Sequence, residues 1–199
     1  MFKKICYSVL FVACMLLSGQ LMAQPFADEI AAFKKQDSIA FPPKHAILFV
    51  GSSSFRKWTD VQQYFPAYPI VNRGFGGSSL PDMIRYANDI IYPYEPKQII
   101  IYCGENDIAA ADTVTAQMVL ARFTQLFEDI RLHLPKVPVV YISIKPSPSR
   151  WRLRNTMMEA NTLIKKYLRK KRKTRFVSVW DAMLDESGEP KKDIFIECV

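Results

Sequence analysis

The chain has 199 residues, of which 49% are hydrophobic and 13% aromatic, and it carries a formal net charge of +8. A chain of this length corresponds to one domain with a real core, and its hydrophobic content excludes an intrinsically disordered protein. Four cysteines are too few for a disulfide-rich scaffold. Neither a C-x-x-C pair nor an H-E-x-x-H motif occurs, so we expect no metal site.

Residues 1–23 have the features of a secretory signal peptide. Two lysines precede an apolar run of 13 residues, and Ala23 stands at a suitable cleavage point. The run is too short to span a bilayer, and no later stretch is long enough to do so. We therefore expect an exported protein, periplasmic or secreted, whose remaining chain carries a formal charge of +6 once the two lysines are removed. A lipoprotein attached through Cys14 is the less favoured alternative, because Phe11 replaces the leucine expected three residues earlier.

Short apolar runs alternate with helical patterns along the rest of the chain. Residues 24–44 are expected to form a lead-in, with a short helix in "PFADEIAAFKKQDS" and a rigid "FPPKH". The expected strands are residues 46–50, 69–72, 98–103, 137–144 and 175–179, and the expected helices are about 57–65, 80–91, 113–134 and 151–173. Asp112 or Thr113 is the expected cap of the third helix.

The apolar runs lack polar alternation, which is typical of parallel strands covered on both faces. Strand and helix in alternation predict an α/β fold with a five-stranded parallel sheet and right-handed crossovers. No repeat or linker divides residues 45–199, so we expect one domain there. Cys103 ends an apolar run and is expected to be a buried thiol; whether it pairs with Cys198 is left open.

Four unusual loops follow the first four expected strands: "GSSS", "RGFGGSS", "GEND" and "KPSPSRW". The carboxyl ends of parallel strands share one edge of a sheet, where ligands bind. A serine at a sharp strand-to-helix turn exposes its hydroxyl, and acyl transfer also needs donors for the developing oxyanion. Ser53, Gly77 and Asn106 supply these groups. Each loop taken alone is more often only a turn or a helix cap, and the functional interpretation depends on their sharing one edge of the sheet.

The segments "FVGSSSF", "VNRGFGGSSLPD" and "IYCGEND" resemble, in order, the first three sequence blocks of the SGNH/GDSL hydrolases. The resemblance extends over about residues 46–199. It implies a flavodoxin-like three-layer α/β/α sandwich, with Ser53 as nucleophile and Gly77 and Asn106 completing the oxyanion hole. It also implies hydrolysis of an ester, often an acyl or acetyl group on a carbohydrate or lipid, without a cofactor.

Two positions depart from the family pattern. Ser52 replaces the aspartate that precedes the nucleophile, a change that leaves the nucleophile in place. The family's Asp-x-x-His block is not found by residue 199, and Cys198 stands about where its aspartate is expected. The only histidines, His45 and His133, are expected at the opposite end of the sheet. We therefore expect the 199-residue chain to be impaired, because no base activates the serine.

Four residues are candidates for binding substrate. Trp58 and Trp151 offer rings that stack on a sugar, although aromatic residues at helix starts commonly serve packing. Arg73, like Arg150, lies in an expected loop and is suited to a substrate carboxylate, with surface pairing as the alternative.

The favoured interpretation is an exported serine ester hydrolase acting on a small-molecule or carbohydrate ester. A non-catalytic carbohydrate- or lipid-binding protein on the same fold is the alternative. A nucleotide or phosphate binder ranks lower, because "RGFGG" matches neither the P-loop nor G-x-G-x-x-G. Ten basic residues lie between 150 and 173, and we interpret them as a solvated face rather than a nucleic-acid site. The oligomeric state is left open.

Overall fold

The computed structural model describes residues 24–195, which form a five-stranded sheet flanked by helices. The strands are β1 (Ile47–Gly51), β2 (Ile70–Gly74), β3 (Gln98–Tyr102), β4 (Val139–Ile142) and β5 (Thr174–Val177). Their spatial order is β2-β1-β3-β4-β5, and every pairing is parallel. The predicted α/β class and five-stranded parallel sheet are confirmed.

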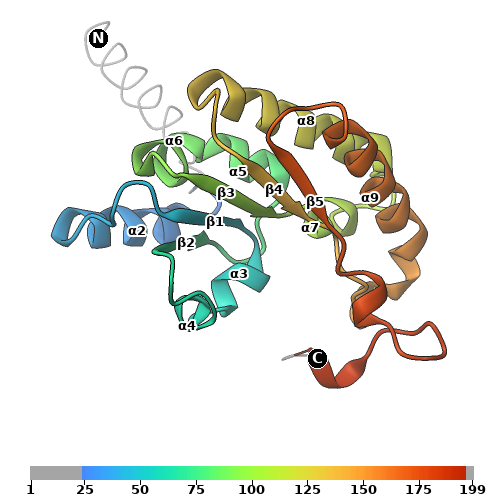
Figure 1. Ribbon diagram of the computed structural model, residues 1–199. Helices are drawn as coiled ribbons and strands as arrows, with labels where there is room; N and C mark the ends of the chain where they lie inside the picture. Colours follow the sequence, from blue (N-terminus) through green and yellow to red (C-terminus); the bar gives the residue numbers. More distant parts are fainter. Residues whose placement is uncertain (1–23, 196–199) are drawn as a thin grey trace, which may run out of the picture.

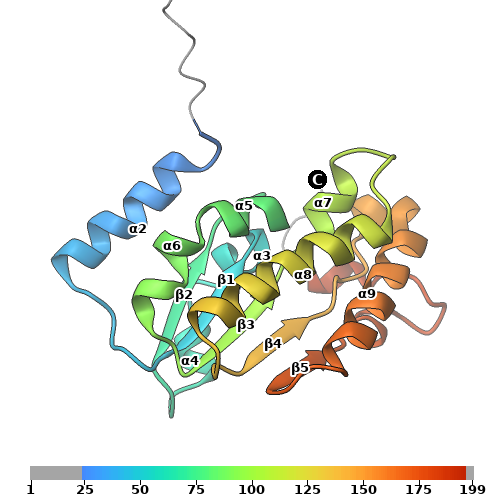
Figure 2. The same ribbon diagram turned by 90° about the horizontal axis from the view of Figure 1, so that it is seen from above.

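Helices cover both faces of the sheet (Figure 1). On one face lie α5 (Leu80–Arg85), α6 (Ala87–Ile90), α8 (Ala116–His133) and α9 (Arg154–Leu168), and on the other α3 (Ser53–Lys57) and α4 (Val61–Tyr64). The remaining α-helices are α2 (Ala27–Ile39), which packs beside α6, and α7 (Glu105–Ala109). The 3-10 helices are η1 (Tyr92–Tyr94), η2 (Pro148–Leu153), η3 (Asp181–Met183) and η4 (Lys192–Ile194). Seen from above, α9 lies beside α8 and near β5 (Figure 2).

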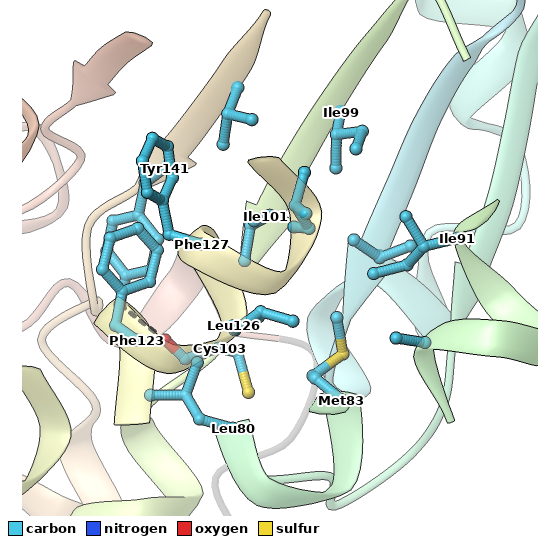
Figure 3. Close-up of a cluster of buried hydrophobic side chains, with 14 of the residues drawn as sticks. Leu80, Met83, Ile91, Ile99, Ile101, Cys103, Phe123, Leu126, Phe127 and Tyr141 are labelled. Atoms are coloured by element: carbon cyan, nitrogen blue, oxygen red, sulfur yellow. Dashed lines mark hydrogen bonds between the residues drawn. The ribbon is translucent and has the colours of Figure 1, made fainter. Parts of the chain in front are cut away.

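The sheet separates two hydrophobic clusters. The larger lies beneath α5, α6, α8 and α9, and Figure 3 shows strand residues Ile99, Ile101 and Tyr141 facing Phe123 and Phe127 of α8. The smaller lies beneath α3 and α4 and is built mainly of aromatic and aliphatic side chains, namely Ile47, Phe49, Phe55, Val61 and Tyr102. All five residues of β1 are buried, as expected for a central strand covered on both faces.

The helix boundaries differ from the sequence expectation in identifiable ways. The expected helix at 57–65 is shortened to α4, because α3 already forms at 53–57, and the expected helix at 80–91 is divided into α5 and α6. The cap of α8 is Thr115, whose side chain accepts a hydrogen bond from the backbone N–H of Met118 at 3.3 Å. Asp112 instead pairs with Arg152 at 2.7 Å. Residues 151–153 belong to η2, and α9 therefore begins three residues later than expected.

Cys103 is a buried free thiol, as expected, and burial raises its pKa well above the ordinary value. The segment assigned as a signal peptide, and Cys198, lie outside residues 24–195. Within residues 24–195, no helix combines the length and apolar character needed to cross a bilayer.

A buried ion pair attaches α2 to the sheet. Arg73 of β2 binds Asp37 of α2, and the two side chains are only 9% and 12% exposed. The hydroxyl of Tyr94 accepts from Arg73 Nε at 2.6 Å and donates to Asp37 at 2.5 Å. Burial, followed by the hydrogen bond to Asp37, raises the pKa of Tyr94 to about 12. The Arg73 guanidinium also lies over the ring of Phe33. The Arg73 guanidinium is therefore buried beneath α2.

We expect Asp37→Ala to lower the free energy of unfolding by about 3 kcal/mol, because it leaves the Arg73 charge buried without its anion. Urea denaturation measures the change. The matched control is Lys34→Ala in the same helix, which removes a mainly exposed pair with Asp89 and should cost under about 1 kcal/mol. Equal effects of the two substitutions would contradict the role given to the buried pair.

Candidate active site

A cavity of about 820 Å³ opens at the carboxyl edge of the sheet. Ser53 and Ser54 reach it from the turn after β1, Glu105 from α7 after β3, and Lys145 and Arg150 from the loop after β4. Residues 179–195 contribute further lining side chains, and in Figure 1 this C-terminal segment runs on the side of the sheet that carries α3 and α4. Three of the four loops singled out in the sequence therefore border one cavity.

The turn that presents Ser53 depends on a close backbone contact. A Cβ at Gly51 would lie 1.9 Å from the carbonyl oxygen of Tyr102 in β3, so only glycine fits there. The same carbonyl accepts from the N–H of Ser52 at 3.1 Å, and the Ser52 carbonyl accepts from Phe55 at 3.0 Å. The second of these bonds starts α3. Ser53 becomes its first residue, half-buried and at the cavity wall.

The two expected donor loops lie against each other. Gly77 adopts a φ of +79°, which favours glycine, and within residues 24–195 its N–H has no hydrogen-bond partner. Asn106 donates from Nδ2 to the carbonyl of Ser78, the residue after Gly77, at 2.9 Å. Neither Gly77 nor Asn106 is among the residues that line the cavity. Their convergence with Ser53 on one reacting group stays a prediction.

Asp107 fastens these loops together. Its carboxylate accepts from the N–H of Leu80 at 2.9 Å and from Arg122 of α8, also at 2.9 Å. The side chain is fully buried, and burial raises its pKa although both partners favour the charged form. Asp107 thus joins the segments after β2 and β3 to α8.

Glu105 is the centre of a charged cluster at the cavity. Its Oε2 atom accepts from Lys145 Nζ at 2.8 Å and from the Tyr102 hydroxyl at 2.7 Å, while Arg150 Nη1 lies 3.2 Å from Oε1. Burial alone would raise the pKa of Glu105. The charge and hydrogen bond of Lys145, the Tyr102 hydrogen bond and the Arg150 charge outweigh burial, so the pKa is lower than usual.

Lys145 is fully engaged by its neighbours. Besides Glu105, its ammonium lies 3.2 Å from Ser54 Oγ and 3.2 Å from the Tyr102 hydroxyl. These three contacts match the three N–H groups of an ammonium, which has no lone pair for a proton. In this arrangement Lys145 organises the cavity wall.

Neither histidine lines the cavity. His45 precedes β1 at the opposite edge of the sheet, and its backbone N–H donates to the carbonyl of Glu95. His133 is the last residue of α8; its ring stacks on Tyr92 at 4.1 Å and its Nδ1 lies 3.0 Å from the carbonyl oxygen of Asp129. Both lie where the sequence placed them, away from Ser53.

Of the four expected substrate-binding residues, Trp58 and Arg150 line the cavity. Trp151 is not among the lining residues: its ring stacks on Trp180 at 6.0 Å, and Arg154 lies over it. Arg73 is likewise absent from the lining, since its guanidinium is engaged with α2.

Sequence reasoning assigned no role to Ser54, Glu105 or Lys145. The loops "GSSS", "GEND" and "KPSPSRW" were singled out, but the sequence does not show which of their side chains meet. The available signal was the presence of two acids, Glu105 and Asp107, and two cations, Lys145 and Arg150, in loops at the same sheet edge.

We expect Glu105→Gln to lower the free energy of unfolding by about 3 kcal/mol at pH 7, because Lys145 and Arg150 lose their shared anion. The folded-state pKa of Glu105 lies below its unfolded value, so its contribution is complete above the ordinary glutamate pKa. That contribution disappears as the pH falls through the lowered pKa, and the difference from wild type should then shrink. Urea unfolding over a pH series tests this. A difference independent of pH, or one shared by the exposed Glu186→Gln control, would contradict it.

Comparisons with known proteins identify the family and the fold. Residues 37–196 match the family model of GDSL-like lipases and acylhydrolases. Similar solved structures include a candidate platelet activating factor from Streptococcus pneumonia, with 20% identity over 96% of this chain and 88% of that chain and a TM-score of 0.73. A GDSL-like lipase from Bacteroides thetaiotaomicron matches with 17% identity, coverage of 84% and 86%, and a TM-score of 0.67.

An acetyl-xylooligosaccharide esterase variant from Geobacillus matches with 15% identity, coverage of 75% and 88%, and a TM-score of 0.54. No curated protein matched the chain. At these identities the structural matches establish the flavodoxin-like α/β/α fold, whereas the family model covers most of the sequence. The chain belongs to the family of GDSL-like lipases and acylhydrolases.

Proposed function

We propose that the protein is an exported serine ester hydrolase that removes acyl or acetyl groups from a carbohydrate ester. The observation that carries the proposal is the position of Ser53, at a strand-to-helix turn on the wall of a large cavity, in a chain of this family. Two structurally similar proteins, the acetyl-xylooligosaccharide esterase and a family 3 carbohydrate esterase from Talaromyces cellulolyticus, support the substrate class. Export rests on the sequence of residues 1–23.

In the proposed reaction, Ser53 Oγ adds to the ester carbonyl carbon and forms a tetrahedral oxyanion. The backbone N–H groups of Ser53 and Gly77 and the amide of Asn106 donate to that oxyanion. The bond to the leaving oxygen then breaks, and the alcohol departs with a proton. Water attacks the acyl-enzyme at the same carbon, releases the carboxylic acid and restores the Ser53 hydroxyl.

We expect the 199-residue chain to turn over slowly. A serine hydroxyl without a base is protonated at neutral pH and is a weak nucleophile. Neither of the two histidines lines the cavity. Oxyanion stabilisation and binding without a complete triad leave roughly 10³–10⁴-fold catalysis over water. An added Asp-x-x-His segment placed after residue 199 should raise the rate.

The test is a p-nitrophenyl acetate assay on two proteins: the 199-residue chain, and the same chain extended by an Asp-x-x-His segment and a following helix. We expect slow hydrolysis by the first, faster hydrolysis by the second, and loss of activity with Ser53→Ala in both. If Ser54→Ala abolished activity and Ser53→Ala did not, the nucleophile would be the next residue along.

Two other outcomes count against parts of the proposal. Comparable Ser53-dependent rates from both proteins would show that a base is already present in the 199-residue chain. An extended protein that folds and binds sugar without hydrolysing any ester would favour the binding-protein alternative.

The amide of Asn106 has a separate test. In the extended, active protein we expect Asn106→Ala to lower kcat by a factor of roughly 10²–10³ with little change in KM. The oxyanion that Asn106 would stabilise develops in the transition state and is absent from the bound substrate. Steady-state kinetics measure both constants. Asn155→Ala, at an exposed position of α9, is the control. An unchanged kcat would limit Asn106 to shaping its loop.

A further inference from the structure

Arg150 is held in place along one part of its guanidinium. It lies in η2, the turn after β4, and lines the cavity that Ser53 also borders. Its Nη1 atom donates to Asn106 Oδ1 at 2.8 Å and lies 3.2 Å from Glu105 Oε1. These contacts hold the planar group against α7 and leave it little freedom to turn.

The rest of the guanidinium is available to a ligand. Within residues 24–195, Nε and Nη2 of Arg150 form no hydrogen bond, and the side chain is 33% exposed. A guanidinium has five N–H donors in a fixed plane, and adjacent donors match the two oxygens of a carboxylate. Lys145, by contrast, uses its three donors on Ser54, Tyr102 and Glu105. The unused donors on this wall therefore belong to Arg150.

The charges on this wall favour an anion. Glu105 is shared by Lys145 and Arg150, so two cations face one buried carboxylate. Lys57 and Asp60, one base and one acid, also line the cavity and leave its described lining with one more positive than negative side chain. An anionic group bound at Arg150 would complete the neutralisation of the pair in a partly desolvated position.

The remaining walls suit a sugar ring. Trp58 and Tyr64 line the same cavity, with ring centroids 5.5 Å apart at an angle of 67°. Aromatic faces pack on flat apolar surfaces such as the C–H face of a pyranose. A cavity of about 820 Å³ is large enough for a ligand of drug-like size.

Resting on the proposed function, we propose that the ester substrate is an acylated sugar acid whose carboxylate binds the free donors of Arg150. The carboxylate would occupy the α7 and η2 wall, and the ring would lie toward Trp58 and Tyr64. The acyl group would then be presented to Ser53. Arg150 is in this arrangement a specificity-determining residue, and its bond to Asn106 links recognition of the acid to the loop that carries the oxyanion donor.

The test measures binding and requires no turnover. Isothermal titration of the full 199-residue protein compares methyl glucuronide with methyl glucoside, and methyl galacturonide with methyl galactoside, at low ionic strength. We expect at least one acid to bind about tenfold more tightly than its neutral partner, since hydrogen bonds to a charged group are worth about that factor. Arg150→Gln should remove this preference, and Arg150→Lys should retain only part of it.

Arg154→Gln is the matched control. It removes the same charge at a residue four positions along the chain that does not line the cavity. It should leave the preference unchanged. Equal binding of acid and neutral sugars would overturn the inference, as would loss of the preference in Arg154→Gln or equal weakening of both sugars by Arg150→Gln. Hydrolysis of neutral esters by a protein with no acid preference would remove this inference and leave the proposed function standing.

Discussion

One buried carboxylate, that of Glu105, orders the carboxyl edge of the sheet. It brings Lys145 and Arg150 together although their like charges repel, because each is close to an opposite charge in a region of low dielectric. Lys145 then reaches Ser54, the residue after Ser53, and Arg150 reaches Asn106. The loops after β1, β3 and β4 are thus coupled through a single anion, and their mutual positions depend on its staying charged.

Polar groups at the carboxyl edge of the sheet are buried and hydrogen-bonded, whereas both faces of the sheet are packed with apolar side chains. Asn161 of α9 shows how this is done: its amide binds both the N–H and the carbonyl of Ile144, at 2.8 and 2.9 Å, directly before Lys145. Ser143 accepts from the N–H of Val179 at 3.0 Å. No buried side-chain nitrogen or oxygen within residues 24–195 lacks a partner. Such satisfied networks fix loop positions more narrowly than apolar packing does.

Features that depend on local sequence could be predicted well. β1 was expected at 46–50 and is found at Ile47–Gly51, because a run of buried apolar residues ending in glycine is a strong signal for a central strand. The strand-to-helix turn at Ser53 and the buried thiol of Cys103 were predicted for the same reason. The cap of α8 was expected at Asp112 or Thr113 and is found at Thr115. All three side chains are capable of capping, and Asp112 pairs with Arg152 instead.

Contacts between distant segments could not be predicted. For Arg73 the sequence left both substrate binding and ion pairing open, and the structure shows a pair with Asp37, 36 residues earlier and in a helix whose docking no periodic pattern reveals. The pairing of Glu105 with Lys145 spans 40 residues and is set by the order of strands in the sheet. Parallel topology indicates which loops are neighbours, but the choice among their side chains depends on packing.

The burial of Cys103 has a consequence for how the molecule is observed. Its Sγ atom lies 3.6 Å from the carbonyl oxygen of Ser78. The backbone carbonyl of Cys103 accepts a hydrogen bond from the Tyr141 hydroxyl at 2.5 Å (Figure 3). Only a thiolate reacts with alkylating reagents, and here the thiolate is both inaccessible and disfavoured. Alkylation of Cys103 must therefore wait until this edge of the sheet opens. In a protein with the other cysteines replaced, the rate at which Cys103 is alkylated would measure local unfolding at this edge of the sheet.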